Sequence, residues 1–160
     1  MQRAIDREDL IKRMAEELEG GLTVYFNLET LEYDALMEEW IEDYGEYLDL
    51  AEEYFKQEIK DWNTNDKYMV ESIYEALKLP ECITPPESYE QFQWMVDFTE
   101  DHSSNHKFFH YAEKALNRRH PFRGFKDTVL FHGLEKEWYA YKSMRMQNWV
   151  RSQVAFLLNR

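Results

Sequence analysis

Cationic and aromatic side chains alternate over residues 118–126, and this segment is the part of the sequence best suited to binding anions. Its cations are Arg118, Arg119, Arg123 and Lys126. Guanidinium groups bind phosphate or carboxylate oxygens through paired hydrogen bonds, and aromatic rings stack on nucleic-acid bases. The segment therefore predicts contact with phosphate or with an acidic partner. The alternative is structural: Phe122 and Phe125 anchor the core, and the arginines pair with acidic residues of the same chain.

An acidic segment lies in the first half of the chain, where no Lys or Arg occurs between Met14 and Phe55. Its carboxylates at helical steps of three and four residues are Glu38, Glu42, Glu46 and Asp49. Carboxylates so spaced could bind a divalent cation, or imitate a phosphate backbone for a basic protein. A solvated helix face explains the same pattern. We keep these four residues as a candidate acidic face.

Three histidines, His102, His106 and His110, are spaced four residues apart. On one unbroken helix they would align and could bind zinc. However, residues 103–105 read as a helix start, which would place His102 outside and leave His106 and His110 with Glu113. This pair suggests a metal-dependent enzyme as one alternative function.

Motifs for nucleophilic or cofactor chemistry do not occur in the sequence. Cys82 has no histidine nearby in sequence, and neither a Gly-x-Ser-x-Gly motif nor a glycine-rich phosphate loop is present. We therefore predict no catalytic, cofactor-binding or metal-binding residues and no cofactor, and we expect a protein that is not an enzyme.

Composition indicates one folded domain over residues 1–160. Hydrophobic residues make up 44% of the chain and aromatic residues 16%, which is enough for a packed core. A lone cysteine fits a reducing compartment, and the charged N-terminus lacks the apolar stretch of a secretory signal. No apolar run approaches the roughly 20 residues of a membrane span. We expect a cytoplasmic protein without membrane contact.

The net charge of −13 is unevenly distributed. Residues 1–101 carry a net charge of −20, and residues 102–160 carry +7. Either the two halves face one another in the fold, or one of them meets a charged partner. A homodimer that joins the acidic half of one copy to the basic half of another would also fit.

Periodicity predicts a mainly α fold of the α+β kind, with a small antiparallel hairpin near the N-terminus. A first helix capped by Asp6 ends at Gly20–Gly21. Strands are expected at 22–28 and 31–35, around a tight turn at 29–30. Acidic helices follow from residue 36, with a break at Gly45.

Further helices are expected at 68–77, at 88–100 and from Asn105 to about residue 117. Ser88 and Gln91 read as a capping box for the second of these. Residues 118–127 read as a connector that leads into a short helix ending at Gly133. A last long helix is expected at 135–158.

Three segments carry a resemblance to a known family. They are residues 24–30 (Val-Tyr-Phe-Asn-Leu-Glu-Thr), residues 85–98, and residues 121–127 (Pro-Phe-Arg-Gly-Phe-Lys-Asp) with Trp138-Tyr139. Together they resemble segments of uncharacterised protein family zero-one-five-eight, a set of small bacterial proteins. Leu31 stands where that family usually has a turn glycine, and Gly124 where it often has arginine. The resemblance implies no known activity or cofactor, and therefore no site residues.

These observations support three hypotheses of function. The first is a non-enzymatic interaction protein that binds another macromolecule, most simply a protein, through its charged surfaces. The second is a nucleic-acid-associated protein that contacts phosphate through residues 118–126. The third is a metal-dependent enzyme at His106 and His110.

Overall fold

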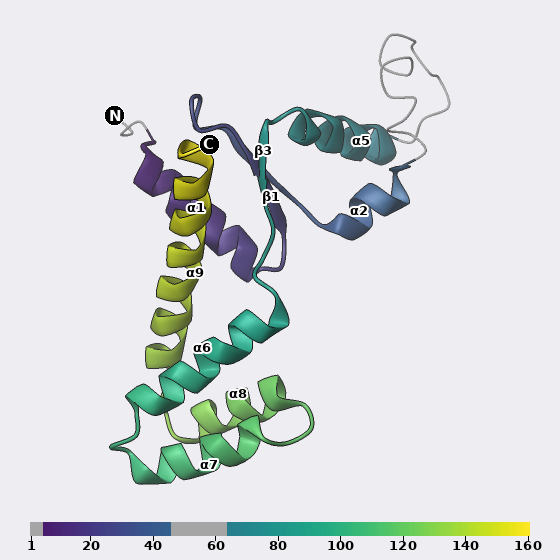
Figure 1. Ribbon diagram of the computed structural model, residues 1–160. Coiled ribbons are helices and arrows are strands. Elements are labelled where there is room, and N and C mark those ends of the chain that lie inside the picture. The colour runs from purple at the N-terminus through teal and green to yellow at the C-terminus, as the bar shows by residue number, and fades with distance from the viewer. Residues whose placement is uncertain (1–4, 46–63) are drawn as a thin grey trace. The chain divides into compact units, whose positions relative to one another are not determined.

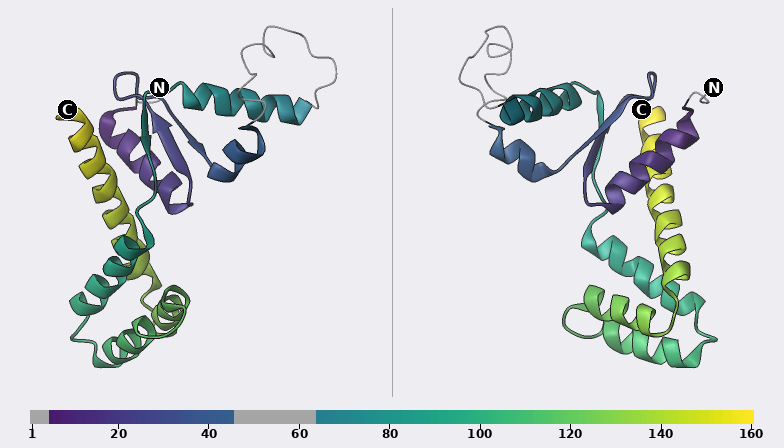
Figure 2. Two further views of the ribbon diagram at one scale, coloured as in Figure 1. Left: turned by 45° about the vertical axis from the view of Figure 1, so that its right-hand side comes forward. Right: turned by 180° about the vertical axis from the view of Figure 1, so that it is seen from behind.

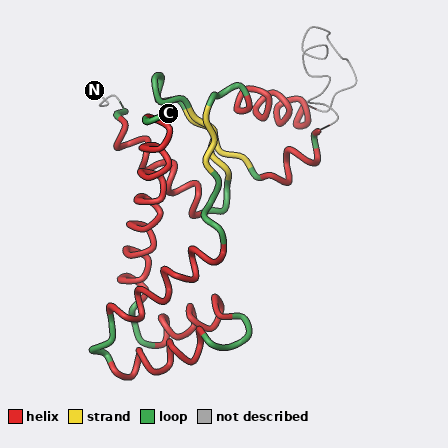
Figure 3. Tube along the Cα trace, viewed as in Figure 1, coloured by secondary structure: helices red, strands yellow, loops and turns green. Residues whose placement is uncertain are grey.

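The computed structural model describes residues 5–45 and 64–160, most of which are helical (Figure 3). The chain divides into two compact units. Unit 1 comprises Met1–Pro85 with Gln153–Arg160, and unit 2 comprises Pro86–Ser152. The prediction of a mainly α fold with a small antiparallel sheet near the N-terminus is confirmed. The single-domain organisation expected for residues 1–160 stays a prediction.

Unit 1 begins with α1 (Arg7–Glu19), whose N-terminus is fixed by a capping box. The Asp6 side chain accepts a hydrogen bond from the Asp9 amide at 2.8 Å, and the Asp9 side chain accepts one from the Asp6 amide at 3.1 Å. The helix ends at Gly20, and Gly21 then adopts a left-handed φ of 83°. Helical spacing places the apolar residues on one buried face: Leu10, Ile11, Met14, Ala15 and Leu18.

The sheet of unit 1 has three short antiparallel strands in the order β2-β1-β3. They are β1 (Thr23–Phe26), β2 (Tyr33–Leu36) and β3 (Glu81–Ile83). The expected hairpin is present, with Thr23 opposite Leu36 and Phe26 opposite Tyr33. β3 was not predicted, because three residues are too few to show an alternating pattern. It pairs with the free edge of β1, where Cys82 lies opposite Tyr25.

The two faces of the sheet are covered by different helices. Figures 1 and 2 show α1 on one side and α2 (Glu38–Asp43) with α5 (Thr64–Leu77) on the other. On the second side Leu36 is buried with two residues of α5, Ile73 and Ala76. Tyr25 and Trp40 are partly buried against this cluster. Because successive side chains of a strand point to opposite faces of the sheet, β1 contributes side chains to both faces.

The hairpin turn contains a leucine in a conformation that favours glycine. Leu31 has a φ of 63°, and its amide donates to the carbonyl of Asn27 at 2.8 Å. The Asn27 side chain accepts hydrogen bonds from the amides of Glu29 and Thr30 at 2.8 and 3.2 Å. Asn27 therefore organises the turn, while Leu31 is held in a left-handed geometry that costs a non-glycine residue about 1–2 kcal/mol.

Unit 2 is helical and contains α6 (Ser88–Asp101), α7 (His106–Leu116), α8 (Pro121–Phe131) and the first part of α9 (Glu135–Leu158). α9 has the predicted bounds. Asn105 caps α7 by accepting a hydrogen bond from the Phe108 amide, as expected. Gly133, with a φ of 68°, follows α8 as expected.

Two local predictions for unit 2 are wrong. Glu87, not Ser88, is the N-cap of α6, and its side chain makes no capping hydrogen bond. Gln91 instead donates to the carbonyl of Pro86 at 2.9 Å. The expected connector at residues 118–127 is mostly helix, because Pro121 occupies the start of α8 and its fixed φ favours the first helical turn.

Phe98 is the centre of the core of unit 2. It is 1% exposed, and rings from the three other helices surround it. These are Phe108 of α7, Phe125 of α8, and Trp138 and Tyr141 of α9, with ring centroids 5.2–6.2 Å from that of Phe98. All four contacts are edge-to-face, the geometry that the charge distribution of aromatic rings favours. One side chain of α6 therefore links all four helices.

We predict that Phe98→Ala lowers the free energy of unfolding by about 3–5 kcal/mol, because it removes a buried ring and leaves a cavity. Phe98→Leu should cost less, since it keeps part of the apolar volume. Tyr89→Ala is the control on the same helix, because Tyr89 is 70% exposed and its loss should change stability by about 0.5 kcal/mol at most. Urea unfolding followed by tryptophan fluorescence measures all three. Equal losses for Phe98→Ala and Tyr89→Ala would contradict the central role of Phe98.

We predict that Leu31→Gly is more stable than Leu31→Val by about 1 kcal/mol or more. Glycine adopts the left-handed geometry without strain, whereas a β-branched residue is a severe outlier there. Both variants shorten the side chain, and the larger unfolded-state entropy of glycine opposes part of the expected difference. Thermal unfolding of the two variants provides the measurement. A valine variant that melts at or above the glycine variant would refute the assignment of strain.

Candidate functional site

Helix α8 lines several cavities of unit 2, and two of them lie on different sides of its axis. Arg123, Gly124, Asp127 and Thr128 line one cavity, whereas Phe122, Phe125 and Lys126 line the other. Successive residues of a helix are rotated by about 100°, so positions i, i+1, i+4 and i+5 share one side. We call the first cavity the basic hollow and the second the aromatic pocket.

The basic hollow lies between α7 and α8 and has a volume of about 440 Å³. Its lining residues are Tyr111, Lys114, Ala115, Arg118, Arg119, His120, Arg123, Gly124, Asp127 and Thr128. The four cations among them are all exposed. The structure thus gathers three of the four predicted anion-binding residues, Arg118, Arg119 and Arg123, around one cavity.

The turn between α7 and α8 brings these cations together. His120, the N-cap of α8, has left-handed backbone angles, with φ 59° and ψ 57°. Histidine is among the non-glycine residues enriched in this conformation. A Cβ added to Gly124 would lie 3.4 Å from the Cβ of Ala115, which shows how closely the two helices approach. A tight turn and a close helix pair therefore place Arg118 and Arg123 on the same cavity.

The electrostatic environment of the basic hollow is strongly positive. Within residues 5–45 and 64–160, no carboxylate lies within ion-pair distance of Lys114, Arg118, Arg119 or Arg123. Asp127 is the one acid among the lining residues. Cations at the end of α7 also interact favourably with the negative end of its dipole.

Lys126 does not line the basic hollow, because it lies on the opposite side of α8 from Asp127 and Thr128. Conversely, Lys114 and Tyr111 line this cavity but were not predicted from the sequence. The signal that could have found Lys114 is its position four residues before Arg118, in the last turn of the helix that precedes the basic segment.

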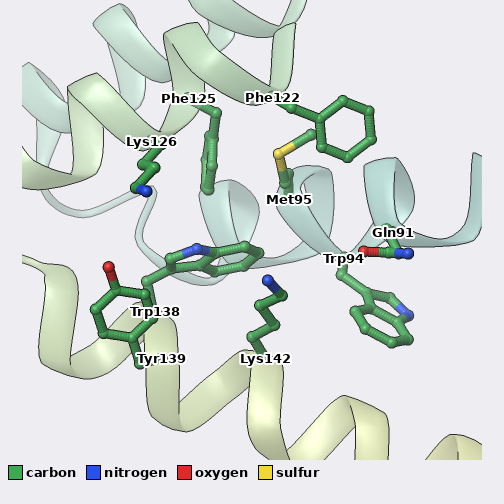
Figure 4. Close-up of a pocket in the computed structure, with 9 residues that line it drawn as sticks. All are labelled: Gln91, Trp94, Met95, Phe122, Phe125, Lys126, Trp138, Tyr139 and Lys142. Carbon is green, nitrogen blue, oxygen red and sulfur yellow. The ribbon is translucent and has the colours of Figure 1, made fainter. Parts of the chain in front are cut away.

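The aromatic pocket lies among α6, α8 and α9 and has a volume of about 200 Å³ (Figure 4). Its lining residues are Gln91, Trp94, Met95, Phe122, Phe125, Lys126, Trp138, Tyr139 and Lys142. The indole of Trp138 is 8% exposed, while Phe122 is 44% exposed. The pocket therefore has a fixed aromatic wall and a partly open side. No sequence pattern pointed to it, since its lining residues come from three different helices.

Another arginine of unit 2, Arg145, differs from the cations of the basic hollow because it has carboxylate and hydroxyl partners within the fold. Arg145 of α9 forms an ion pair with Asp97 of α6, and its Nε and Nη2 donate to the Tyr141 hydroxyl at 3.0 and 2.7 Å. Burial alone would lower the pKa of Arg145, but these partners raise it above the usual value. Arg145 is therefore a structural cation, in contrast to those of the basic hollow.

The candidate acidic face is described only in part. Glu38 and Glu42 lie one helical turn apart on α2, and both are exposed. Glu46 and Asp49 lie outside the described residues.

The histidines do not form a metal site among the described residues. His102 follows α6, where its ring packs 4.1 Å from that of Phe98 and its Nδ1 lies 2.8 Å from the Phe98 carbonyl oxygen. It therefore lies outside α7, as expected, whereas His106 and His110 belong to that helix. Across residues 5–45 and 64–160, no three His, Cys, Asp or Glu side chains could hold one ion.

Cys82 lies on β3 next to two titratable groups of unit 1. Burial raises the pKa of its thiol, a hydrogen bond from the Tyr25 hydroxyl lowers it, and the negative charge of Glu38 raises it. The net effect is a raised pKa, so the thiol is a weaker nucleophile at neutral pH than a free cysteine. The pKa of Tyr25 is raised by burial, by Cys82 and by the negative charge of Glu38.

Comparison of the chain with protein-family models, with curated proteins and with solved structures found no match. Within the part of the chain that the structure describes, no helix combines the length and the apolar composition that a bilayer span requires.

We predict that Cys82 reacts with iodoacetamide at a higher midpoint pH in the native chain than in the same chain unfolded in urea. Tyr25→Phe should raise the native midpoint further, because the thiolate loses a hydrogen-bond donor. Glu38→Gln should lower it, because a nearby negative charge is removed. The rate of alkylation as a function of pH measures each midpoint. Shifts in the same direction for both variants would contradict this account.

Proposed function

We propose that this protein is a non-enzymatic interaction protein whose basic hollow binds an acidic segment of another protein. One observation carries the proposal: four exposed cations line one cavity, and no carboxylate of the described residues pairs with them. Elsewhere in the structure, Arg145 and Arg160 pair with Asp97 and Glu81. The fold thus leaves a local excess of positive charge that an acidic partner would neutralise.

The geometry suits carboxylates presented on a flexible segment. Arginines bind carboxylates through two parallel hydrogen bonds, and three arginines on one cavity can engage several acidic side chains at once. Tyr111, which lines the same cavity and is 52% exposed, offers an aromatic surface beside them. Interfaces often place tyrosine and arginine together at their energetic centre.

The charge of the whole chain favours a short acidic segment over a long polyanion. Residues 86–152 carry ten Lys or Arg and nine Asp or Glu, whereas the rest of the chain carries nine and twenty-three. The chain therefore repels an extended polyanion at long range. At physiological salt the screening length is about 8 Å, so a short segment experiences mainly the local cations.

Nucleic acid is the second candidate partner, and the same cavity supports it. Guanidinium groups bind phosphate as they bind carboxylate, and Tyr111 could stack on a base. The phosphate contacts proposed at Arg118, Arg119 and Arg123 can converge here, whereas the contact proposed at Lys126 cannot. The metal-dependent enzyme at His106 and His110 gains no support, because no third ligand joins them among the described residues.

Three further proposals each have one supporting observation. A homodimer is supported by the charge complementarity between the acidic first half and the basic hollow. A cytoplasmic location is supported by the single cysteine. Membership of uncharacterised protein family zero-one-five-eight is supported by the left-handed φ of Leu31, the position at which that family usually has glycine.

We predict that a labelled twelve-residue peptide of Glu and Asp binds the full-length chain, with an affinity that falls as salt rises. Arg118→Glu combined with Arg123→Glu should weaken binding about tenfold or more, because two favourable charge contacts become repulsive. Fluorescence anisotropy at several salt concentrations measures both effects. Lys107→Glu is the matched control, because Lys107 is an exposed cation of α7 that does not line the basic hollow.

A single-stranded oligonucleotide of equal charge separates the two candidate partners in the same assay. Tighter binding of the oligonucleotide, with a slope of log affinity against log salt of about −3 for four cations, would replace the acidic segment by nucleic acid. Equal losses in the control and the double variant, or no binding of either probe, would overturn the proposed function.

A further inference from the structure

The aromatic pocket has features that the proposed function does not use. It shares no lining residue with the basic hollow, so the two cavities can be tested independently. It combines five aromatic side chains and a methionine with two lysines from different helices, Lys126 of α8 and Lys142 of α9. We propose that it binds a small carboxylic acid that carries a single aromatic ring.

The volume of the pocket limits the ligand to about one ring. A cavity of about 150 Å³ is large enough for benzene, whereas pockets for drug-sized ligands start at about 300 Å³. The aromatic pocket has about 200 Å³, which leaves room for one ring and a short acidic substituent. A dinucleotide or a large cofactor would not fit.

The walls of the pocket are suited to a flat apolar group. Trp94, Met95 and Trp138 are buried, and Phe125 packs edge-to-face on Trp138 with ring centroids 4.9 Å apart. The indole of Trp138 thus lies in a fixed orientation as the floor of the pocket (Figure 4). Such a preformed aromatic surface favours ring stacking, because little side-chain entropy is lost on binding.

The two lysines specify the charge of the ligand. In Figure 4 the side chains of Lys126 and Lys142 both extend toward the space around Trp138. Neither ammonium has an ion-pair partner among the described residues, and Lys142 is half-buried. A carboxylate at the open side of the pocket would neutralise both groups, whereas an amine would be repelled.

Nuclear magnetic resonance titration of the full-length protein with three probes tests this proposal. Phenylacetate has both the ring and the acid, 2-phenylethylamine has the ring with the opposite charge, and acetate has the acid alone. Phenylacetate should bind with a dissociation constant on the order of 1 mM, as expected for about ten non-hydrogen atoms. It should shift the indole N–H signals of Trp94 and Trp138, and the other two probes should bind at least about tenfold more weakly.

Variants identify the groups responsible. Lys126→Met combined with Lys142→Met should weaken phenylacetate binding about tenfold or more while keeping the aliphatic side chains. Phe122→Ala should also weaken it, by removing a partly exposed ring of the pocket. Lys136→Met is the matched control, because Lys136 is an exposed lysine of α9 outside the pocket and should leave binding unchanged. Circular dichroism verifies that each variant is folded.

Several results would overturn the proposal. These are equal binding of acetate or 2-phenylethylamine, phenylacetate shifts that spare both tryptophans, and a double lysine variant that binds as well as the control. Because the comparison of probes uses the unaltered protein, it remains decisive if a variant fails to fold. If the unaltered protein binds phenylacetate but neither the acidic peptide nor the oligonucleotide, the proposed function is contradicted and this inference is left intact.

Discussion

The buried aromatic cluster around Phe98 is the constraint on which the geometry of unit 2 depends. Phe98 contacts rings from α7, α8 and α9, and each contact is edge-to-face. Edge-to-face packing restricts both the distance and the angle between rings, so the cluster limits how each helix can rotate about its axis. The rotation of α8 in turn determines which of its side chains line each cavity. Both candidate binding sites therefore depend on one phenylalanine that lines neither.

The charge separation seen in the sequence has two different outcomes in the structure. Some basic residues of the second half pair with acids of the first 101 residues, as Arg145 does with Asp97 and Arg160 with Glu81. The cations of the basic hollow have no such partners among the described residues. Cations of the first kind connect parts of the fold, whereas cations of the second kind are available to a partner. Only the second kind supports a proposal of function.

Helix ends and helix faces were largely predictable, because both depend on residues close in sequence. The capping of α1 by Asp6 and of α7 by Asn105 follows from side chains that accept hydrogen bonds from backbone amides three residues later. The capping box proposed at Ser88 and Gln91 failed because Gln91 found an acceptor at Pro86 instead. β3 was missed because its only support is pairing with β1, a strand more than fifty residues earlier.

The sequence by itself determined the fold class, most helix bounds, and the presence of a basic and aromatic segment near residue 120, because these depend on composition and on periodicity within one element. Only the tertiary structure decided which cations act together. Arg123 and Lys126 are three residues apart in the chain, yet helical rotation and the packing of α7 and α9 against α8 place them on different cavities. Lys114 and Lys142 joined those cavities from neighbouring helices. Cavities arise between elements, and the relative rotation of packed helices is a property of the whole core that no local pattern contains.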